Sequence, residues 1–315
     1  MAPSRLQTTG GSPMVKWWLA GWCMALAACG PQPEDAHTAP QYSTKAPSAV
    51  RQYVFAIHPL HNPARLFALY GPLIDYLNRH LPDTPLRLEA SRNYEEFEKK
   101  LYGRQLDFAL PNPYQTLNSL HHGYRVIAKM GDDQLFTGLI LVRRDSDIRK
   151  TTDLKGKKVA YPAATALAAT MMPQYYLQTH GLDVQRDIEN VYVGSQESSI
   201  LNVYYGNTAA AATWPLPWRE FQKEQPEKAA ELEVKWQTEH LINNGVVVRD
   251  DVPPELAEKV TVLLETLHTT SEGEALLQRL ELSQFERADN RRYQVIKEFL
   301  HLFSQKVRPL PERLP

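Results

Sequence analysis

The sequence predicts an α/β protein with two lobes, in which helices cover mostly parallel sheets and a two-strand hinge joins the lobes. Three observations support this fold class. The chain has 315 residues, which is too many for one ordinary core. Segments with strand and helix patterns alternate, as they do in parallel α/β units. The alternation also starts afresh near Lys157, after a first series is complete.

The first lobe is expected from residues 51–144 and 242–315. It opens with the strand Tyr53–Ile57, a β-branched and aromatic run. The next segment has apolar residues at helical spacing from Leu66 to Leu77, with Pro72 inside, which predicts a kinked helix. The later predicted elements are a strand at 86–88, a helix near 94–102, a strand at 106–110, a helix after 111–114, strands near 125–129, 136–143 and 243–248, and helices from 254 to 303.

The second lobe is expected from residues 145–241. Its predicted elements are a strand at 157–161, a turn at 162–166, a helix ending at 180–181, a strand at 191–193, a turn at 194–198 that enters a helix, and a strand at 209–212. The chain then crosses between the lobes twice, near Asp145 and near Leu241. Two crossings make a hinge, and a cleft between hinged lobes is where a small ligand is captured.

The first 50 residues are predicted to precede this folded body. The apolar stretch from Trp17 to Ala28 has the length of a signal-peptide core and is too short for an ordinary membrane span. It ends in Leu26-Ala27-Ala28-Cys29, which resembles a bacterial lipobox. That resemblance implies a lipoprotein signal peptide at 1–28, lipidation of Cys29, and anchoring on the periplasmic side of the inner or outer membrane. A plain secretory signal cut at Ala28 is the alternative. Residues 29–50 are rich in proline and read as a flexible tether.

Composition excludes several classes of protein. Hydrophobic residues make up 43% and charged residues 23%, which is typical of a globular chain. The net charge is −1 and no long basic run occurs, so no nucleic-acid partner is expected. Two cysteines build neither a disulfide scaffold nor a cysteine-rich zinc site. Without a Gly-x-Ser-x-Gly elbow, an HExxH helix or a Walker loop, we expect no enzyme, cofactor or metal.

Four segments resemble, in order and spacing, the phosphate/phosphite/phosphonate periplasmic binding proteins of ABC transporters (PhnD-like). They are Ala64–Leu77, Leu141–Ile148 with Asp153–Ala160, Gly194–Ser198 and Gly206–Ala212. The resemblance implies a type II-like Venus-flytrap fold that captures a small, anionic (phosphonate- or phosphate-like) or polar ligand for an ABC permease. A receptor that presents the same cleft to a membrane sensor kinase is the alternative.

The ligand is expected outside the carboxyl ends of the parallel strands, where helix N-termini suit an oxyanion. The turn 162–166 is the main candidate. The family places Ser-Thr-Ser there, whereas this chain has Ala164-Thr165-Ala166, so two hydroxyl donors are missing. Each such hydrogen bond contributes roughly 1.5–3 kcal/mol. Gln196 replaces a frequent histidine and Trp214 a frequent aspartate or small residue, which predicts a less charged pocket.

The candidate ligand-binding residues are therefore Thr165, Ala164, Ala166, Gln196, Tyr114, Asn112, Trp214, Ser195, His58 and Thr137. Several have a structural alternative that the sequence leaves open. Thr165 and Ser195 are also suited to cap helices, and Asn112 to form a turn. Trp214 is equally compatible with the core. His58 and His61 lack a third ligand nearby, which disfavours a metal site.

Overall fold

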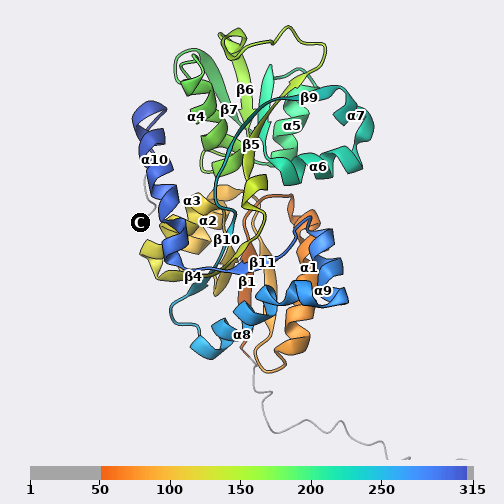
Figure 1. The fold of residues 1–315 in the computed structure, drawn as a ribbon, viewed down its shortest axis with the longest axis vertical. Coiled ribbons are helices and arrows are strands. Elements are labelled where there is room, and N and C mark those ends of the chain that lie inside the picture. The colour runs from red at the N-terminus through yellow and green to blue at the C-terminus, as the bar shows by residue number, and fades with distance from the viewer. Residues whose placement is uncertain (1–50, 311–315) are drawn as a thin grey trace, which may run out of the picture. The chain divides into compact units, whose positions relative to one another are not determined.

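The computed structural model describes residues 51–310, which lie within one compact unit (Figure 1). The predicted signal peptide at 1–28, the lipidation site Cys29 and the tether at 29–50 lie outside the described residues. Two sheets, each covered by helices, form two lobes joined by two crossing segments. The predicted α/β class and the division into two lobes are confirmed.

The first lobe is built on a six-stranded sheet with the order β11-β4-β10-β3-β1-β2. β1 pairs in parallel with β2 and β3, while β10 is antiparallel to both β3 and β4, and β11 is antiparallel to β4. The strands are β1 (Tyr53–Ile57), β2 (Leu86–Ala90), β3 (Phe108–Leu110), β4 (Tyr124–Met130), β10 (Gly245–Arg249) and β11 (Phe285–Arg287).

The second lobe is built on a five-stranded sheet with the order β7-β6-β8-β5-β9. β6 pairs in parallel with β7 and β8, while β5 is antiparallel to β8 and β9. The strands are β5 (Thr137–Arg143), β6 (Lys157–Tyr161), β7 (Ile188–Tyr192), β8 (Ala210–Thr213) and β9 (Leu232–His240).

Two expectations about the sheets need correction. The sheets are mixed rather than mostly parallel, because β10 and β5 each enter their sheet against the direction of its parallel strands. The segment 136–143 was expected in the first lobe, but β5 pairs with β8 and β9 of the second sheet. The first crossing therefore lies at residues 131–136 instead of near Asp145. An apolar strand reads the same in either sheet, so only tertiary pairing settles its place.

The helices cover the faces of both sheets. α1 begins at the side-chain cap of Asn62 and continues through Pro72. The α-helices are α1 (Pro63–His80), α2 (Tyr94–Tyr102), α3 (Pro113–Ser119), α4 (Met172–Thr179), α5 (Gln196–Tyr204), α6 (Pro215–Glu224), α7 (Pro226–Ala230), α8 (Pro254–Glu265), α9 (Ser271–Arg279) and α10 (Gln294–Lys306). Short 3₁₀ turns lie at Leu120–His122, Asp133–Leu135, Thr151–Leu154, Leu267–Thr269 and Asn290–Tyr293, and a π-helical turn at Leu167–Met171.

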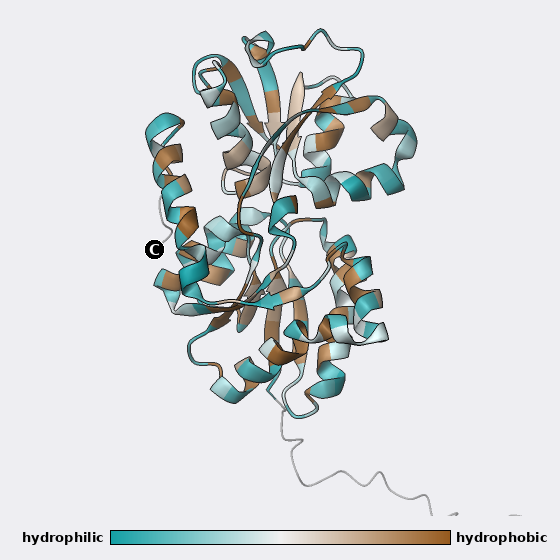
Figure 2. Ribbon diagram, viewed as in Figure 1, coloured by the Kyte–Doolittle hydropathy of each residue, from teal (hydrophilic) through white to brown (hydrophobic). Residues whose placement is uncertain are grey.

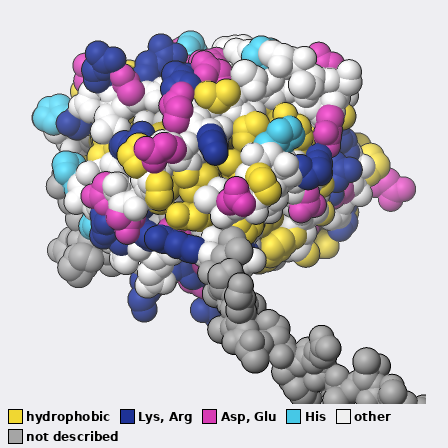
Figure 3. Space-filling view, turned by 90° about the horizontal axis from the view of Figure 1, so that it is seen from below, with side chains coloured by type: hydrophobic (Ala, Val, Ile, Leu, Met, Phe, Trp, Pro, Cys, Tyr) yellow, Lys and Arg dark blue, Asp and Glu magenta, His cyan; other side chains and the backbone are white. Residues whose placement is uncertain are grey.

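The core of each lobe lies between its sheet and its helices. Figure 2 shows hydrophobic residues concentrated on the strands and hydrophilic ones on the outer helix faces. Phe55 of β1 and Phe108 of β3 stack with their ring centroids 6.0 Å apart. On the face shown in Figure 3, acidic and basic side chains are intermixed around hydrophobic ones, in keeping with the net charge of −1. Among residues 51–310, no helix is long and apolar enough to cross a membrane.

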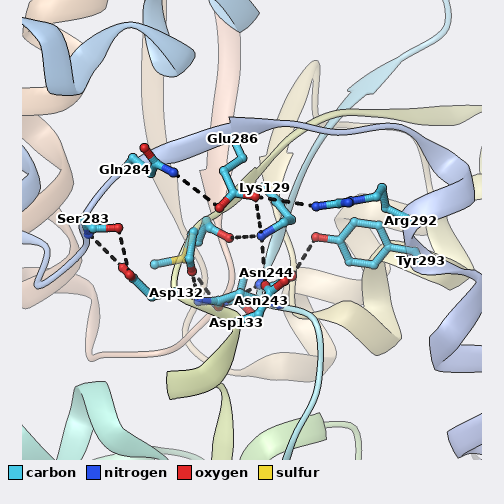
Figure 4. Close-up of polar contacts among 12 residues, drawn as sticks. Lys129, Asp132, Asp133, Asn243, Asn244, Ser283, Gln284, Glu286, Arg292 and Tyr293 are labelled. Carbon is cyan, nitrogen blue, oxygen red and sulfur yellow. Dashed lines mark hydrogen bonds and ion pairs between the residues drawn. The ribbon is translucent and has the colours of Figure 1, made fainter.

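A polar network ties the two crossing segments to each other and to the first lobe (Figure 4). Lys129 at the end of β4 has no exposed side-chain surface, and its Nζ lies 2.9 Å from Asp133 Oδ1 and 3.0 Å from Glu286 Oε2. Asp133 Oδ1 also accepts the amide of Asn243 from the second crossing at 2.9 Å. Tyr293 donates its hydroxyl to the carbonyl of Asn243 at 2.6 Å. The two crossings are therefore held side by side.

Candidate functional site

A small cavity of about 10 Å³ lies where the two lobes meet the crossing segments. His58 follows β1 and Asn112 follows β3, while Trp214 follows β8. These positions lie outside the carboxyl ends of parallel strands, where ligands bind in open α/β sheets. The full lining consists of His58, Tyr94, Asn112, Phe136, Ala166, Leu167, Ala168, Ala169, Gln196, Trp214 and Asn244.

The wall from the second lobe is the π-helical turn Leu167–Met171, which runs directly into α4. The carbonyl of Ala166 accepts the amides of Thr170 at 2.9 Å and of Met171 at 3.1 Å. The amides of residues 167–169 belong to the first turn, where an amide has no acceptor within its own helix. The positive end of the helix dipole lies at the same place. This wall therefore suits an oxyanion held by backbone amides.

Two side-chain amides connect the lobes at the cavity. Asn112 caps α3, because its Oδ1 accepts the amide of Gln115 at 3.1 Å. Its Nδ2 then donates to the carbonyl of Thr165 in the second lobe at 3.1 Å. Gln196 donates from Nε2 to the hydroxyl of Tyr94 in the first lobe at 3.2 Å, and its Oε1 accepts from Thr213 at 3.0 Å. Both amides are thereby fixed by partners on each side of the cleft.

The hydroxyl of Thr165 is bound by a carboxylate of the first lobe. Glu98 of α2 accepts a hydrogen bond from the Thr165 side chain, and another from Gln115 Nε2 at 2.8 Å. Only 7% of Glu98 is exposed, and this burial raises its pKa above the usual value. Thr165 therefore uses its hydroxyl in a contact between the lobes, and it does not line the cavity.

The cavity carries no lysine, arginine, aspartate or glutamate in its lining. His58 is its only titratable imidazole, and Nδ1 lies 2.8 Å from the carbonyl of Leu110, so Nδ1 bears the proton. Burial lowers the pKa of His58 from 6.5 to about 4, so the ring is neutral at pH 7. The neighbouring His61 is lowered to a pKa of about 3, first by burial and then by Arg65 and His58. A ligand here meets dipoles and hydrogen-bonding groups instead of formal charges.

The neutral state of His58 predicts a pH dependence of stability. Between about pH 6.5 and 4, the unfolded chain binds a proton on this ring and the folded protein does not. The free energy of unfolding should therefore fall by about 3 kcal/mol as pH is lowered through this window. We expect His58→Asn, whose amide also reaches the Leu110 carbonyl, to lack this contribution. Urea unfolding of both proteins at pH 4.5 and 7 measures it, and parallel pH profiles would contradict the assignment.

The structure brings five of the predicted site residues to one cavity: His58, Asn112, Ala166, Gln196 and Trp214. The other five lie outside its lining. Thr165 bonds Glu98, and the carbonyl of Ala164 accepts from Arg308 at 2.7 Å. Ser195 caps α5, Thr137 accepts from Gln237 at 3.2 Å, and Tyr114 is buried in α3. Ligand contact by any of the ten remains a prediction.

The candidate list from the sequence did not include Tyr94, Asn244 or the segment 167–169, which also line the cavity. A signal for Tyr94 exists, because it opens a helix capped by Asn93 directly after β2. Phe136 and Asn244 lie in the two crossing segments, which have no recognisable motif. Both crossings thus contribute a side chain to the cavity. A ligand in the cavity would therefore contact residues of the hinge directly.

Ion pairs close the cleft on its outer side. Arg65 near the start of α1 pairs with Glu220 and, at 3.1 Å, with Glu224 of α6. On the same helix, Lys223 and Arg219 pair with Glu281 of the first lobe. Within residues 51–310, no group of three or more histidine, cysteine, aspartate or glutamate side chains is placed to hold a metal ion.

A family comparison assigns this architecture. The family model described as "ABC transporter, phosphonate, periplasmic substrate-binding protein" matches residues 55–293, which is most of the chain. The chain belongs to this family. The resemblance inferred from the sequence is thereby confirmed, and so is the expectation of a binding protein rather than an enzyme. Membership also places the protein among periplasmic proteins.

Individual relatives are distant in sequence but close in fold. The probable ABC transporter phosphite binding protein PhnD1 of Prochlorococcus marinus (strain MIT 9301) is 22% identical over 197 residues, 58% of this chain. The match spans 65% of that relative, slightly less than two thirds of its length.

Two solved structures show the same fold. A binding protein component of an ABC phosphonate transporter from Pseudomonas aeruginosa has a TM-score of 0.74 at 17% identity, covering 81% of this chain and 86% of that one. PhnD1 from Prochlorococcus marinus (MIT 9301) in complex with methylphosphonate has a TM-score of 0.73 at 17% identity, covering 80% and 98%. The predicted two-lobed periplasmic binding protein fold is confirmed.

Proposed function

We propose that this protein is the receptor of an ABC importer and binds a small phosphonate or related phosphorus oxyanion between its lobes. The observation that carries the proposal is the helix start at residues 167–169, which lines a cavity at the junction of the lobes. Family membership supports the same class of ligand. The ABC permease is the proposed partner that receives the ligand.

The mode of binding follows from what the lining offers. Because no charged side chain lines the cavity, the oxyanion is held by helix-start amides together with the neutral groups of Asn112, Gln196 and His58. The Ser-Thr-Ser hydroxyls of the family are reduced here to Thr165, which Glu98 already engages. Backbone donors therefore carry a larger share of the binding energy than side-chain hydroxyls do.

Ligand entry requires a rearrangement. A cavity of about 10 Å³ holds roughly one water molecule, far less than any phosphonate. The lobes must part, or the lining side chains must move, before a ligand is admitted. In proteins with two lobes joined by a hinge, the usual way to admit a ligand is opening of the hinge. We also propose that Cys29 anchors the receptor to the membrane, supported by the Leu26–Cys29 pattern alone.

Calorimetric titration of the purified protein tests the proposal. Methylphosphonate, phosphite and phosphate are the probes, and methanesulfonate is a size-matched oxyanion without an ionisable hydroxyl. At about 100 times its dissociation constant, a true ligand adds roughly 2.7 kcal/mol to the free energy of unfolding. The proposal fails if none of the three phosphorus oxyanions binds.

A pair of variants isolates the backbone amides. Leu167→Pro removes the first amide of the turn, and proline is tolerated there because Ala166 is already extended (φ −74°, ψ 103°). Leu167→Ala loses the same side chain but keeps the amide. A hydrogen bond to a charged ligand contributes about 1.5–3 kcal/mol, so Leu167→Pro should bind roughly 10- to 100-fold more weakly than Leu167→Ala. Equal affinities of Leu167→Pro and Leu167→Ala would mean that the Leu167 amide does not bind the oxyanion.

A further inference from the structure

The last helix, α10, begins in the first lobe and ends beside the second. Tyr293, directly before it, donates to the carbonyl of Asn243 in the crossing segment. Further along, Phe299 packs edge-on against Tyr175 of α4 with ring centroids 5.6 Å apart. Near its end, Lys306 Nζ lies 5.7 Å from the centroid of the same tyrosine ring. Figure 1 shows α10 standing alongside both lobes.

The chain beyond α10 reaches the candidate ligand turn. Arg308 donates from Nη2 to the carbonyl of Ala164 at 2.7 Å, and from Nε to Gln174 Oε1 at 3.1 Å. Its guanidinium carbon lies 5.0 Å from the ring centroid of Phe303, which holds it against α10. Both acceptors belong to the second lobe, and Ala164 lies three residues before Leu167, where the helix-start wall of the cavity begins.

Gln174 gives this contact a rigid base. Its side chain is fully buried, and its Nε2 lies 3.0 Å from Asn190 Oδ1 and 3.2 Å from the Tyr192 hydroxyl. The amide group is thus fixed with its oxygen toward Arg308. A half-buried, charge-assisted hydrogen bond to such a preorganised acceptor is stronger than a hydrogen bond between two exposed side chains.

We propose that Arg308 is a positioning residue for ligand binding, which fixes the turn at Ala164 and straps the lobes together in the closed state. The proposal rests on the function proposed above and adds a noncovalent connection, made by the chain that follows α10, to the two covalent crossings. Because α10 is rooted in the first lobe, parting of the lobes breaks both hydrogen bonds of Arg308. They therefore stabilise the closed state and raise the barrier to ligand release. Association of the ligand with the open state does not involve them.

Ligand kinetics distinguish this role from general stabilisation. We expect Arg308→Ala to release methylphosphonate about tenfold faster, with an association rate unchanged within a factor of two. Arg308→Lys, which reaches one acceptor but not both, should give an intermediate rate. Arg291→Ala is the matched control, because Arg291 is an exposed arginine of the same lobe whose ion-pair partner within residues 51–310 is Asp289. Stopped-flow mixing that follows intrinsic tryptophan fluorescence gives both rates.

A second readout needs no ligand. Dyes on cysteines at Asp83 and Gln185, one exposed position in each lobe, report the distance between the lobes once Cys23 and Cys29 are serine. Arg308→Ala should shift the population toward larger distances, and Arg291→Ala should not. If the wild type binds no phosphorus oxyanion, the function proposal fails while this measurement still tests the strap. If the wild type binds and Arg308→Ala changes neither the release rate nor the lobe distance, the strap is refuted.

Discussion

Replacing Lys129 by methionine is expected to lower the free energy of unfolding by about 3 kcal/mol. Methionine matches the length of the lysine stem and removes the ammonium group alone. Asp133 would then lose its cation, and Glu286 would keep only the longer contact with Arg292 at 3.6 Å. Loss of one partner from a buried ion pair costs about 3–5 kcal/mol, and the lower end applies because both carboxylates are about one-third exposed. Urea denaturation followed by circular dichroism measures the change.

Lys158→Met is the control for this prediction. Lys158 also pairs with a glutamate, Glu189, at 3.3 Å, but both side chains are more than half exposed. An exposed pair contributes about 0–1 kcal/mol, so this variant should unfold close to the wild type. Equal losses in the two variants would mean that the network at the crossings contributes no more than a surface ion pair.

Replacing Gly138 by alanine is expected to weaken ligand binding by at least about tenfold and to destabilise the protein by roughly 1–3 kcal/mol. A Cβ atom on Gly138 would lie 2.6 Å from the carbonyl oxygen of Ala168 and 2.7 Å from Cδ of Pro173. Both atoms belong to the helix that carries the amide wall, and neither is the end of a flexible side chain. The wall must therefore move away from β5, which displaces the amides from the cavity. Calorimetric titration with methylphosphonate gives the affinity.

Gly71→Ala provides the matched control, since it makes the same chemical change inside α1. No atom lies within 4 Å of the added methyl group, and alanine favours the helix by roughly 0.5–1 kcal/mol over glycine. Gly71→Ala should therefore be at least as stable as the wild type and bind with the same affinity. Wild-type affinity in Gly138→Ala would show that the wall tolerates displacement.

The elements of the fold were predictable because their signals are local. Tyr53–Ile57 and Lys157–Tyr161 are strands in the structure at the bounds that their apolar runs predict. The sheet to which a strand belongs is decided by tertiary pairing instead. β5 was therefore assigned to the wrong lobe, and the edge strand β9 was not anticipated, since charged residues interrupt its pattern.

The same distinction applies to the site. Asn112, Gln196 and Trp214 were found because each follows a strand directly or opens the next helix, a position that the sequence reveals. Glu98 was not found, because it contacts Thr165 from a helix of the other lobe. No local sequence pattern near either residue predicts this contact. The local pattern assigned the Thr165 hydroxyl to a ligand, whereas packing gives it a carboxylate partner.

The position of β10 has a consequence for the order of assembly. This strand lies between β3 and β4 in the middle of the first sheet, yet it comes after the entire second lobe in the chain. Until Gly245–Arg249 has been synthesised, the strand that pairs with both β3 and β4 is missing. The part of the first sheet that contains β4 then cannot pair with the part that contains β1, β2 and β3. The second sheet, by contrast, is one contiguous stretch from Thr137 to His240. During vectorial synthesis or export, the lobe that emerges second is therefore the one that can fold first.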